Sequence, residues 1–258
     1  MNPFEFRQGN TPLLISIPHA GTGLTPEVRS GLASAAQGLC DTDWHLPRLY
    51  EFADEVGASL LVANYSRFVI DLNRPPDDKP LYNTATTGLW PETLFDGTPI
   101  FRPGKGPTAE QRQQYLSDIW QPYHTQLQDE LARIKARFGY ARLFDAHSIA
   151  SVIPRLFAGK LPDLNLGTNA GVSCSPLLGL RLQEVCEAQS DFSWVVNGRF
   201  KGGYITRAYG QPAEGIEAVQ LELAQCNYME EAPPFDWDSG RALRVQPLLK
   251  KLVTTFLS

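Results

Sequence analysis

The chain has 258 residues, of which 43% are hydrophobic and 20% charged, and its formal net charge at pH 7 is -5. This length fits one large domain or two small ones and is ample for a sizeable core, and the composition is ordinary for a globular protein. The acidic balance argues against a nucleic-acid partner, and no apolar run is long enough to span a membrane.

Short β-rich runs alternate with amphipathic stretches, which is typical of an α/β fold. In chain order, the first half predicts a strand at Leu13–Ile17, a helix at Thr42–Val56, strands at Ser59–Ala63 and Phe68–Leu72, and a long functional loop over residues 73–106. The second half predicts a helix from Thr108 to Phe138 that Pro122 should kink, a strand at Arg142–Ala146, a loop over residues 163–171, a helix at Pro176–Ala188, strands at Phe192–Asn197 and Ala218–Leu223, and a helix at Arg241–Phe256. We therefore expect residues 1–258 to form a single domain with a mixed β-sheet flanked by helices.

The cysteines and the N-terminus indicate a compartment. Four cysteines are scattered without a Cys-x-x-Cys pair, so neither a disulfide framework nor a zinc finger is expected. Residues 1–5 lack the basic and then apolar pattern of a signal peptide. We expect a cytoplasmic protein that is a monomer or a small homo-oligomer.

Two of the four histidines follow predicted strands closely. His19 comes after Leu13–Ile17, and His147 comes after Arg142–Ala146. In open α/β sheets, ligands bind beyond the carboxyl ends of the strands. A catalytic zinc typically takes three His, Asp or Glu ligands and leaves one position for water. We therefore expect His19 and His147 to bind a metal ion.

The third ligand is expected to be an aspartate, with three candidates. Asp41 and Asp43 lie where a loop meets a predicted helix, so either one suits a helix N-cap. Because one cap does not require both, we assign Asp43 as the ligand and Asp41 as the cap or as a residue behind the ligands, with the reverse assignment open. Asp145 shares a strand face with His147, so it either orients that imidazole or serves as the third ligand.

Glu222 is the candidate general base. It lies in a run where Val219, Leu221 and Leu223 point to one face and Gln220 and Glu222 to the other. Such a glutamate is either exposed at a sheet edge or directed into a site. Near a metal ion it would take a proton from the attacking water and return it to the departing amine.

Polar residues near the predicted strand ends are candidates to bind an acidic substrate. Arginine binds carboxylates with a bidentate fork, although an exposed arginine is usually only solvated. His124, beside Pro122, either lines the site or packs next to it. The candidate substrate-binding residues are Asn73, Arg74, His124, Ser148 and Arg207.

Six segments, in order between Leu13 and Tyr228, together resemble the N-formylglutamate amidohydrolase family. They are Ser16-Ile17-Pro18-His19-Ala20-Gly21, Asp41-Thr42-Asp43-Trp44-His45, Ile70-Asp71-Leu72-Asn73-Arg74, Pro122-Tyr123-His124, Asp145-Ala146-His147-Ser148 and Gly202-Gly203-Tyr204-Ile205-Thr206-Arg207. The resemblance implies hydrolysis of N-formyl-L-glutamate to formate and L-glutamate, a step of histidine degradation. It also implies a phosphorylase/hydrolase-like fold related to zinc carboxypeptidases.

In those carboxypeptidases a His-x-x-Glu segment supplies two ligands, a later histidine supplies the third, and a strand glutamate acts as the base. The corresponding segment here is His19-Ala20-Gly21-Thr22, which has no glutamate at its fourth position. The resemblance therefore assigns His147 as the later histidine and Glu222 as the base, and it makes Asp43 the expected third ligand.

The sequence thus predicts a hydrolase that acts on a small acidic N-acyl amino acid with a divalent metal ion, for which the ligand types favour zinc. Two alternatives stay open at this stage. One is a zinc hydrolase of another N-acyl amino acid or a short peptide. The other is a non-catalytic protein that binds small carboxylates through its arginines.

Overall fold

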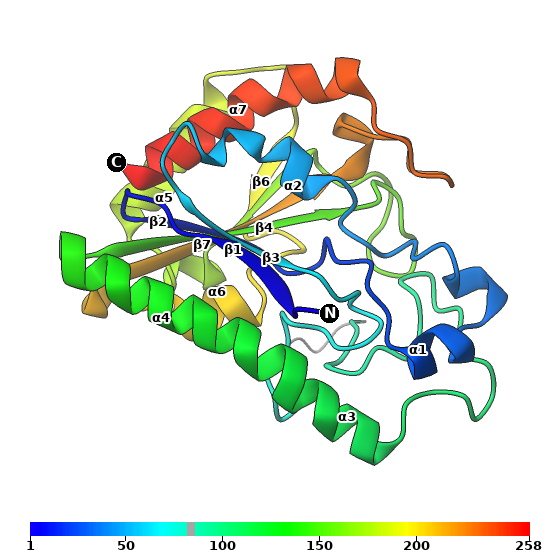
Figure 1. The fold of residues 1–258 in the computed structure, drawn as a ribbon. Coiled ribbons are helices and arrows are strands. Elements are labelled where there is room, and N and C mark those ends of the chain that lie inside the picture. Colours follow the sequence, from blue (N-terminus) through cyan, green and yellow to red (C-terminus); the bar gives the residue numbers. More distant parts are fainter. Residues whose placement is uncertain (82–85) are drawn as a thin grey trace.

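A seven-stranded mixed sheet runs through the computed structural model, which describes residues 1–81 and 86–258 (Figure 1). The strand order is β1-β3-β2-β4-β7-β5-β6. The strands are β1 Phe4–Arg7, β2 Leu13–Ile17, β3 Ser59–Ala63, β4 Ala141–Ile149, β5 Leu164–Gly167, β6 Trp194–Val196 and β7 Ile216–Ala224. The central strands β3, β2, β4 and β7 are mutually parallel, whereas β1 and β5 are antiparallel to β3 and β7.

Helices cover both faces of the sheet. The helices are α1 Pro26–Gly31, α2 Leu46–Leu49, α3 Ala109–Tyr115, α4 Gln121–Phe138, α5 Pro176–Glu187, α6 Tyr204–Tyr209 and α7 Ser239–Leu257. Figure 1 shows α2, α5 and α7 on one side of the sheet and α4 and α6 on the other. Each side has its own hydrophobic core, and a third, smaller cluster forms around Ile149, Ile153 and Leu161. The expected single mixed sheet flanked by helices is confirmed.

The central strands are buried along most of their length because helices cover both of their faces. All five residues of β2 are buried, as are eight consecutive residues of β7. Since β2, β4 and β7 are parallel, their carboxyl ends lie at one edge of the sheet, where ligands usually bind. Within this edge, His147 of β4 and Glu222 of β7 are paired in register.

Most of the predicted strands and helices are confirmed, with shifts of a few residues at their ends. Strands β2 and β3 have the predicted bounds, and α5 and α7 match within two residues. Strand β4 runs three residues past the predicted end at Ala146, so His147 lies inside the strand and not beyond it.

The predicted helix at Thr42–Val56 is wrong over most of its length. Only the four-residue α2 and a short 3₁₀ turn at Glu51–Ala53 are helical. His45 has φ 63°, and Pro47 lies in the first turn of α2 without an N–H to donate. A helix therefore cannot extend back through His45 toward the two aspartates.

Two other assignments are also wrong. Phe68–Leu72 is not a strand, because the backbone turns at Ser66–Val69 and the apolar run is buried under loops. The predicted loop over residues 163–171 contains β5, which pairs with β7. The described part of the predicted loop over residues 73–106 contains isolated β-bridges but neither a helix nor an extended strand. Residues 82–85 of this loop lie outside the described chain.

The long helix accommodates its proline by a change of winding. Thr108 and Gln111 form the predicted capping box, and α3 is followed by a π-helical turn at Leu116–Trp120 before α4 begins. Pro122 lies in the first turn of α4 and lacks the N–H that a continuous α-helix would use. A π turn of this kind bends a helix without ending it.

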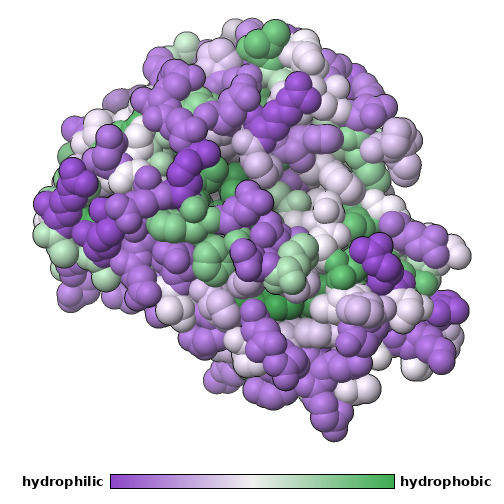
Figure 2. Space-filling view, in the orientation of Figure 1, coloured by the Kyte–Doolittle hydropathy of each residue, from purple (hydrophilic) through white to green (hydrophobic). Residues whose placement is uncertain are grey.

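The surface drawn in Figure 2 is mainly hydrophilic, with hydrophobic residues in smaller separate patches. All four cysteines are free thiols, as expected. Within residues 1–81 and 86–258, the structure contains no helix that is both long and apolar enough to cross a bilayer.

Candidate metal centre and substrate pocket

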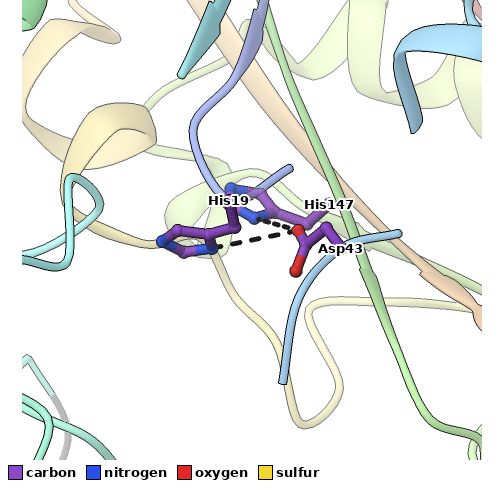
Figure 3. Close-up of side chains that lie close together, drawn as sticks. All are labelled: His19, Asp43 and His147. Carbon is purple, nitrogen blue, oxygen red and sulfur yellow. Dashed lines mark hydrogen bonds and ion pairs between the residues drawn. The ribbon is translucent and has the colours of Figure 1, made fainter. Parts of the chain in front are cut away.

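Three segments distant in the sequence bring His19, Asp43 and His147 together (Figure 3). His19 lies two residues after β2, and His147 lies near the end of the adjacent strand β4. Asp43 belongs to the loop before α2, where its backbone N–H donates to the His19 carbonyl oxygen at 3.1 Å. The Ser148 backbone N–H donates to Asp43 Oδ2, also at 3.1 Å. Backbone contacts to both neighbouring segments therefore fix Asp43 in place.

The three side chains have the geometry of a metal site. One potential ligand atom from each residue lies within 4.8 Å of the others. Asp43 Oδ2 is 3.1 Å from His147 Nδ1 and 3.8 Å from His19 Nδ1. All three residues are at most 3% exposed, so bulk water screens the electrostatic interactions among them only weakly.

The second nitrogen of each imidazole contacts a buried carboxylate. His19 Nε2 lies 2.7 Å from Asp71 Oδ1, and His147 Nε2 lies 3.2 Å from Asp145 Oδ2. Histidine ligands of metal ions usually donate their other N–H to a carboxylate, which fixes the ring and strengthens the ligating nitrogen. Both rings therefore present Nδ1 to the same point beside Asp43.

Asn73 lies behind the His147 ring and donates to the same carboxylate, Asp145. Its Oδ1 accepts the Ile205 backbone N–H at 2.8 Å, which determines how its amide is oriented. Its Nδ2 then lies 2.9 Å from His147 Nε2 and 3.4 Å from Asp145 Oδ2. Gly203, at the start of α6, is required here because a Cβ would lie 2.4 Å from Asn73 Nδ2.

The electrostatics favour an added cation. Asp43, Asp71 and Asp145 converge here, and Arg67 is the cation that lies closest in the described contacts, with its Nη2 at 2.7 Å from Asp71 Oδ2. Burial lowers the pKa of His19, with a further contribution from Arg67. Burial also disfavours the charged form of His147, but Asp145 and Asp43 outweigh it and raise its pKa well above the usual value.

These donors fit a divalent metal ion such as zinc. Two imidazole nitrogens and one carboxylate form a common catalytic zinc ligand set, and the excess of buried negative charge stabilises a cation. The neutral imidazole that a metal ion requires is already favoured at His19. The fourth residue of the His19-Ala20-Gly21-Thr22 segment does not take part, because Thr22 is exposed and lines a different hollow.

Glu222 lies beside this cluster. It is 7% exposed, and its Oε2 accepts from Gln220 Nε2 at 3.1 Å. Gln220 is held in turn by the Gly203 backbone N–H, which donates to its Oε1 at 2.7 Å. Burial raises the pKa of Glu222 to about 8, while His147 acts in the opposite direction. A carboxyl group with its pKa near neutrality is suited to both accepting and returning a proton.

A pocket opens directly onto His19, His147 and Glu222. Its walls contain both arginines and apolar side chains. The lining residues are His19, Arg67, Asn73, Arg74, Thr86, Thr87, Phe95, His147, Ile149, Leu156, Arg199, Phe200, Gly203, Gln220 and Glu222. Such a pocket suits a small anion that carries some hydrocarbon.

Hydrogen bonds to backbone carbonyl oxygens orient the guanidinium of Arg74. Its Nε donates to the Thr87 carbonyl oxygen at 2.7 Å, and its Nη1 donates to the Asn73 carbonyl oxygen at 2.8 Å. Both Arg74 and Asn73 lie in the pocket wall.

The other predicted residues lie elsewhere in the described chain. Asp41 accepts the Phe95 backbone N–H at 2.8 Å and caps no helix. Ser148 Oγ accepts from the Tyr228 hydroxyl at 2.7 Å, and it lines a neighbouring hollow with Asp41. Arg207 Nε donates to the Gly202 carbonyl oxygen at 2.8 Å, and Arg207 is absent from the pocket wall.

His124 does not line the pocket but packs beneath it. Its ring stacks on Trp120 with centroids 3.8 Å apart. Its Nε2 lies 2.9 Å from the Leu72 carbonyl oxygen and its Nδ1 lies 2.8 Å from the Tyr209 hydroxyl. Both nitrogens are thus satisfied by neutral groups, so its role is structural.

Sequence reasoning did not assign roles to Arg67, Asp71, Arg199 or Gln220. Asp71 interrupts an apolar run in the segment that also contains Asn73 and Arg74. A charged residue inside such a run was the available signal, and the structure shows that Asp71 is buried. The sequence analysis placed Gln220 on the same strand face as Glu222 but assigned a role only to Glu222. Arg67 and Arg199 lie in turns, and no pattern in the sequence indicates where such side chains point.

Comparison with known proteins gives a family. A family model described as N-formylglutamate amidohydrolase matches residues 11–229. The chain is 59% identical over 254 residues to an N-formylglutamate deformylase of Pseudomonas aeruginosa, covering 98% of this chain and 96% of that protein. It is 58% identical to an N-formylglutamate deformylase of Pseudomonas putida, covering 98% of this chain and 95% of that protein.

Solved structures share the fold. The crystal structure of an N-formylglutamate amidohydrolase from Ralstonia eutropha superimposes with a TM-score of 0.83 at 24% identity, covering 100% of this chain and 96% of that one. A protein from Agrobacterium tumefaciens superimposes with a TM-score of 0.77 at 16% identity, covering 100% and 95%. At these identities the likeness supports the fold alone.

Proposed function

The chain belongs to the N-formylglutamate amidohydrolase family, and from this we propose that it hydrolyses N-formyl-L-glutamate to formate and L-glutamate with the aid of a divalent metal ion. The observation that carries the proposal is the convergence of His19, Asp43 and His147 beside a buried glutamate in a pocket lined with arginines. Those three residues would hold the metal ion, and a set of two imidazoles and a carboxylate favours zinc.

When bound there, the metal ion would polarise the formyl carbonyl and make water more acidic. Glu222 then accepts a proton from the water that attacks the formyl carbon. The C–N bond breaks, Glu222 returns the proton to the departing nitrogen, and formate and the free amine are the products. The pairing of Glu222 in register with His147 supports this role.

Arg67 is suited to stabilise the negative charge that develops on the formyl oxygen. It lines the pocket, and its guanidinium is held between Asp71 and the ring of Phe95, whose centroid lies 4.7 Å from the guanidinium carbon. A fixed cation in a buried site stabilises a transition-state charge without having to reorganise. Arg74 is placed to bind a carboxylate of the substrate.

The same proposal extends to the setting of the enzyme. We propose that residues 1–258 act as one catalytic domain and that formate release is a step of histidine degradation, which the family resemblance supports. Four free thiols are in keeping with a cytoplasmic protein.

The test pairs metal analysis with a formate-release assay on protein purified without chelator. We expect about one equivalent of a divalent metal ion, formate release from N-formyl-L-glutamate, and loss of both after chelation with recovery on adding Zn²⁺. Formate release that is indifferent to chelation would contradict the metal-assisted mechanism. No release from N-formyl-L-glutamate, with release from another N-acyl amino acid, would contradict the substrate assignment.

A further inference from the structure

The pocket contains an arginine whose role the proposed mechanism leaves open. Arg199 lies in the segment after β6 and lines the same pocket as Arg67 and Arg74. Its Nε donates to the Leu156 carbonyl oxygen at 2.9 Å, which orients the plane of the guanidinium. An oriented guanidinium is a better carboxylate ligand than a mobile one, because less freedom is lost on binding.

The three pocket arginines stand in different surroundings. Arg67 is 6% exposed and forms an ion pair with Asp71 at the metal cluster. Arg74 adjoins Asn73, which contacts His147, so it belongs to the wall next to the metal cluster. Arg199 instead lies in the C-terminal half of the chain, and its guanidinium contacts Leu156 and Phe200.

The wall that carries Arg199 is apolar. Ile149, Leu156 and Phe200 line the pocket there and belong to the third hydrophobic cluster, which is separate from the two main cores. Methylene groups gain free energy when they leave water for such a surface. The α-carboxylate of an N-acyl amino acid has no methylene between it and Cα, whereas the side-chain carboxylate of glutamate lies beyond two of them.

We propose that Arg199 binds the side-chain carboxylate of the substrate, with the glutamate methylenes on Ile149, Leu156 and Phe200, and that it thereby sets the preference for an acidic amino acid. This inference rests on the proposed hydrolysis of N-formyl-L-glutamate. Arg74 is then the ligand of the α-carboxylate, which every N-formyl amino acid carries. Arg207 donates to the Gly202 carbonyl oxygen and is not assigned a carboxylate.

The experiment compares two substrates that differ only in the charge of the side chain, N-formyl-L-glutamate and N-formyl-L-glutamine. Arg199→Gln should lower kcat/KM for the first by about 100-fold and change kcat/KM for the second by less than about threefold, because only the first loses a bidentate ion pair between a guanidinium and a carboxylate. Arg74→Gln should lower both by similar factors. Arg181→Gln, at an exposed arginine on α5, is the control for the loss of one positive charge.

Product binding gives a readout that does not depend on turnover. By calorimetry, Arg199→Gln should weaken the binding of L-glutamate by a factor similar to its loss in kcat/KM and leave that of L-glutamine unaltered. If Arg199→Gln does not fold, Arg199→Lys carries the test, since it keeps a charge but loses the fork. Its preference for glutamate over glutamine should then fall between that of the wild type and one.

Equal losses on both substrates, or an unaltered preference in Arg199→Lys, would overturn the assignment of Arg199. A wild-type protein that releases no formate from N-formyl-L-glutamate would instead overturn the proposed function. The two failures are therefore distinguishable in one series of assays.

Discussion

Two buried regions of the molecule contain histidines, and they differ in what the imidazoles contact. At the edge of the sheet, His19 and His147 each have one nitrogen on a carboxylate and present the other to Asp43. Under the sheet, His124 has both nitrogens on neutral partners, a carbonyl oxygen and a hydroxyl. Both regions are almost inaccessible to solvent.

The pKa values of His147 and His124 shift in opposite directions, whereas burial and Arg67 lower the pKa of His19 as well. Burial lowers the pKa of His124 to about 3, because no anion compensates the lost hydration of an imidazolium. At the sheet edge, Asp145 and Asp43 reverse that effect and raise the pKa of His147 well above the usual value. Burial alone therefore does not mark a histidine as a metal ligand. The mark is a carboxylate behind the ring and a shared point in front of it.

The largest effect is expected when the proposed general base beside His19 and His147 is removed. Glu222→Gln keeps the shape of the side chain but cannot accept a proton, so kcat should fall by about 10²–10⁴-fold while the metal content stays the same. Steady-state formate release and metal analysis of the same preparation measure the two. The matched control is Glu217→Gln in the same strand, which faces Arg142 at 3.2 Å and should retain activity. Full activity of the Glu222→Gln protein would remove Glu222 from the mechanism.

A smaller effect, on Zn²⁺ affinity, is expected when the carboxylate that contacts His19 Nε2 is changed. We assign Asp71 as a positioning residue, because its Oδ1 lies 2.7 Å from His19 Nε2. Burial would raise its pKa, but His19, Arg67 and Arg74 hold that pKa well below the usual range. Asp71→Asn retains an acceptor for His19 without the charge, so it should weaken Zn²⁺ binding by about 10–100-fold. Competition with a fluorescent chelator measures the affinity. Asp41→Asn, whose carboxylate binds the Phe95 N–H instead, should bind Zn²⁺ like the wild type. Equal affinities in all three proteins would show that Asp71 does not act through His19.

The smallest effect concerns His124 and the pH dependence of stability. The pKa of His124 is about 3 in the folded protein and about 6.5 in the unfolded chain, so between these values the unfolded state binds the extra proton. The free energy of unfolding should therefore fall as the pH drops below about 6.5, by at most about 1.4 kcal/mol per pH unit from this group. His124→Gln should remove this contribution and flatten the profile. Denaturant titrations from pH 4 to pH 7 measure it, and parallel profiles for both proteins would contradict the assignment.

The sheet and the candidate metal-binding histidines were accessible from the sequence because both rest on local patterns. Apolar runs such as Leu13–Ile17 mark strands whose two faces are covered, and His19 follows the first of them directly. Glu222 was recognisable from strand alternation, and the structure gives it the predicted neighbour, His147.

The remainder depends on long-range packing that a single sequence does not encode visibly. Asp41 and Asp43 both suited a helix cap, and the left-handed backbone at His45 together with Pro47 excludes that helix. Arg199 and Arg207 are chemically equivalent in the sequence, yet one lines the pocket and the other holds a turn. Side-chain direction in turns follows from tertiary contacts, so these assignments needed the structure.

The central claim is that the carboxylate-backed histidines bind a metal ion and the neutral-partnered histidine does not. Zn²⁺ affinity of the wild type, His147→Gln and His124→Gln, measured by chelator competition at pH 7, tests it most directly. We expect one tight site in the wild type and in His124→Gln, and binding weaker by at least about 100-fold in His147→Gln, since a ligand is lost from a three-residue set. Unaltered affinity in His147→Gln, or a comparable loss in His124→Gln, would contradict the account.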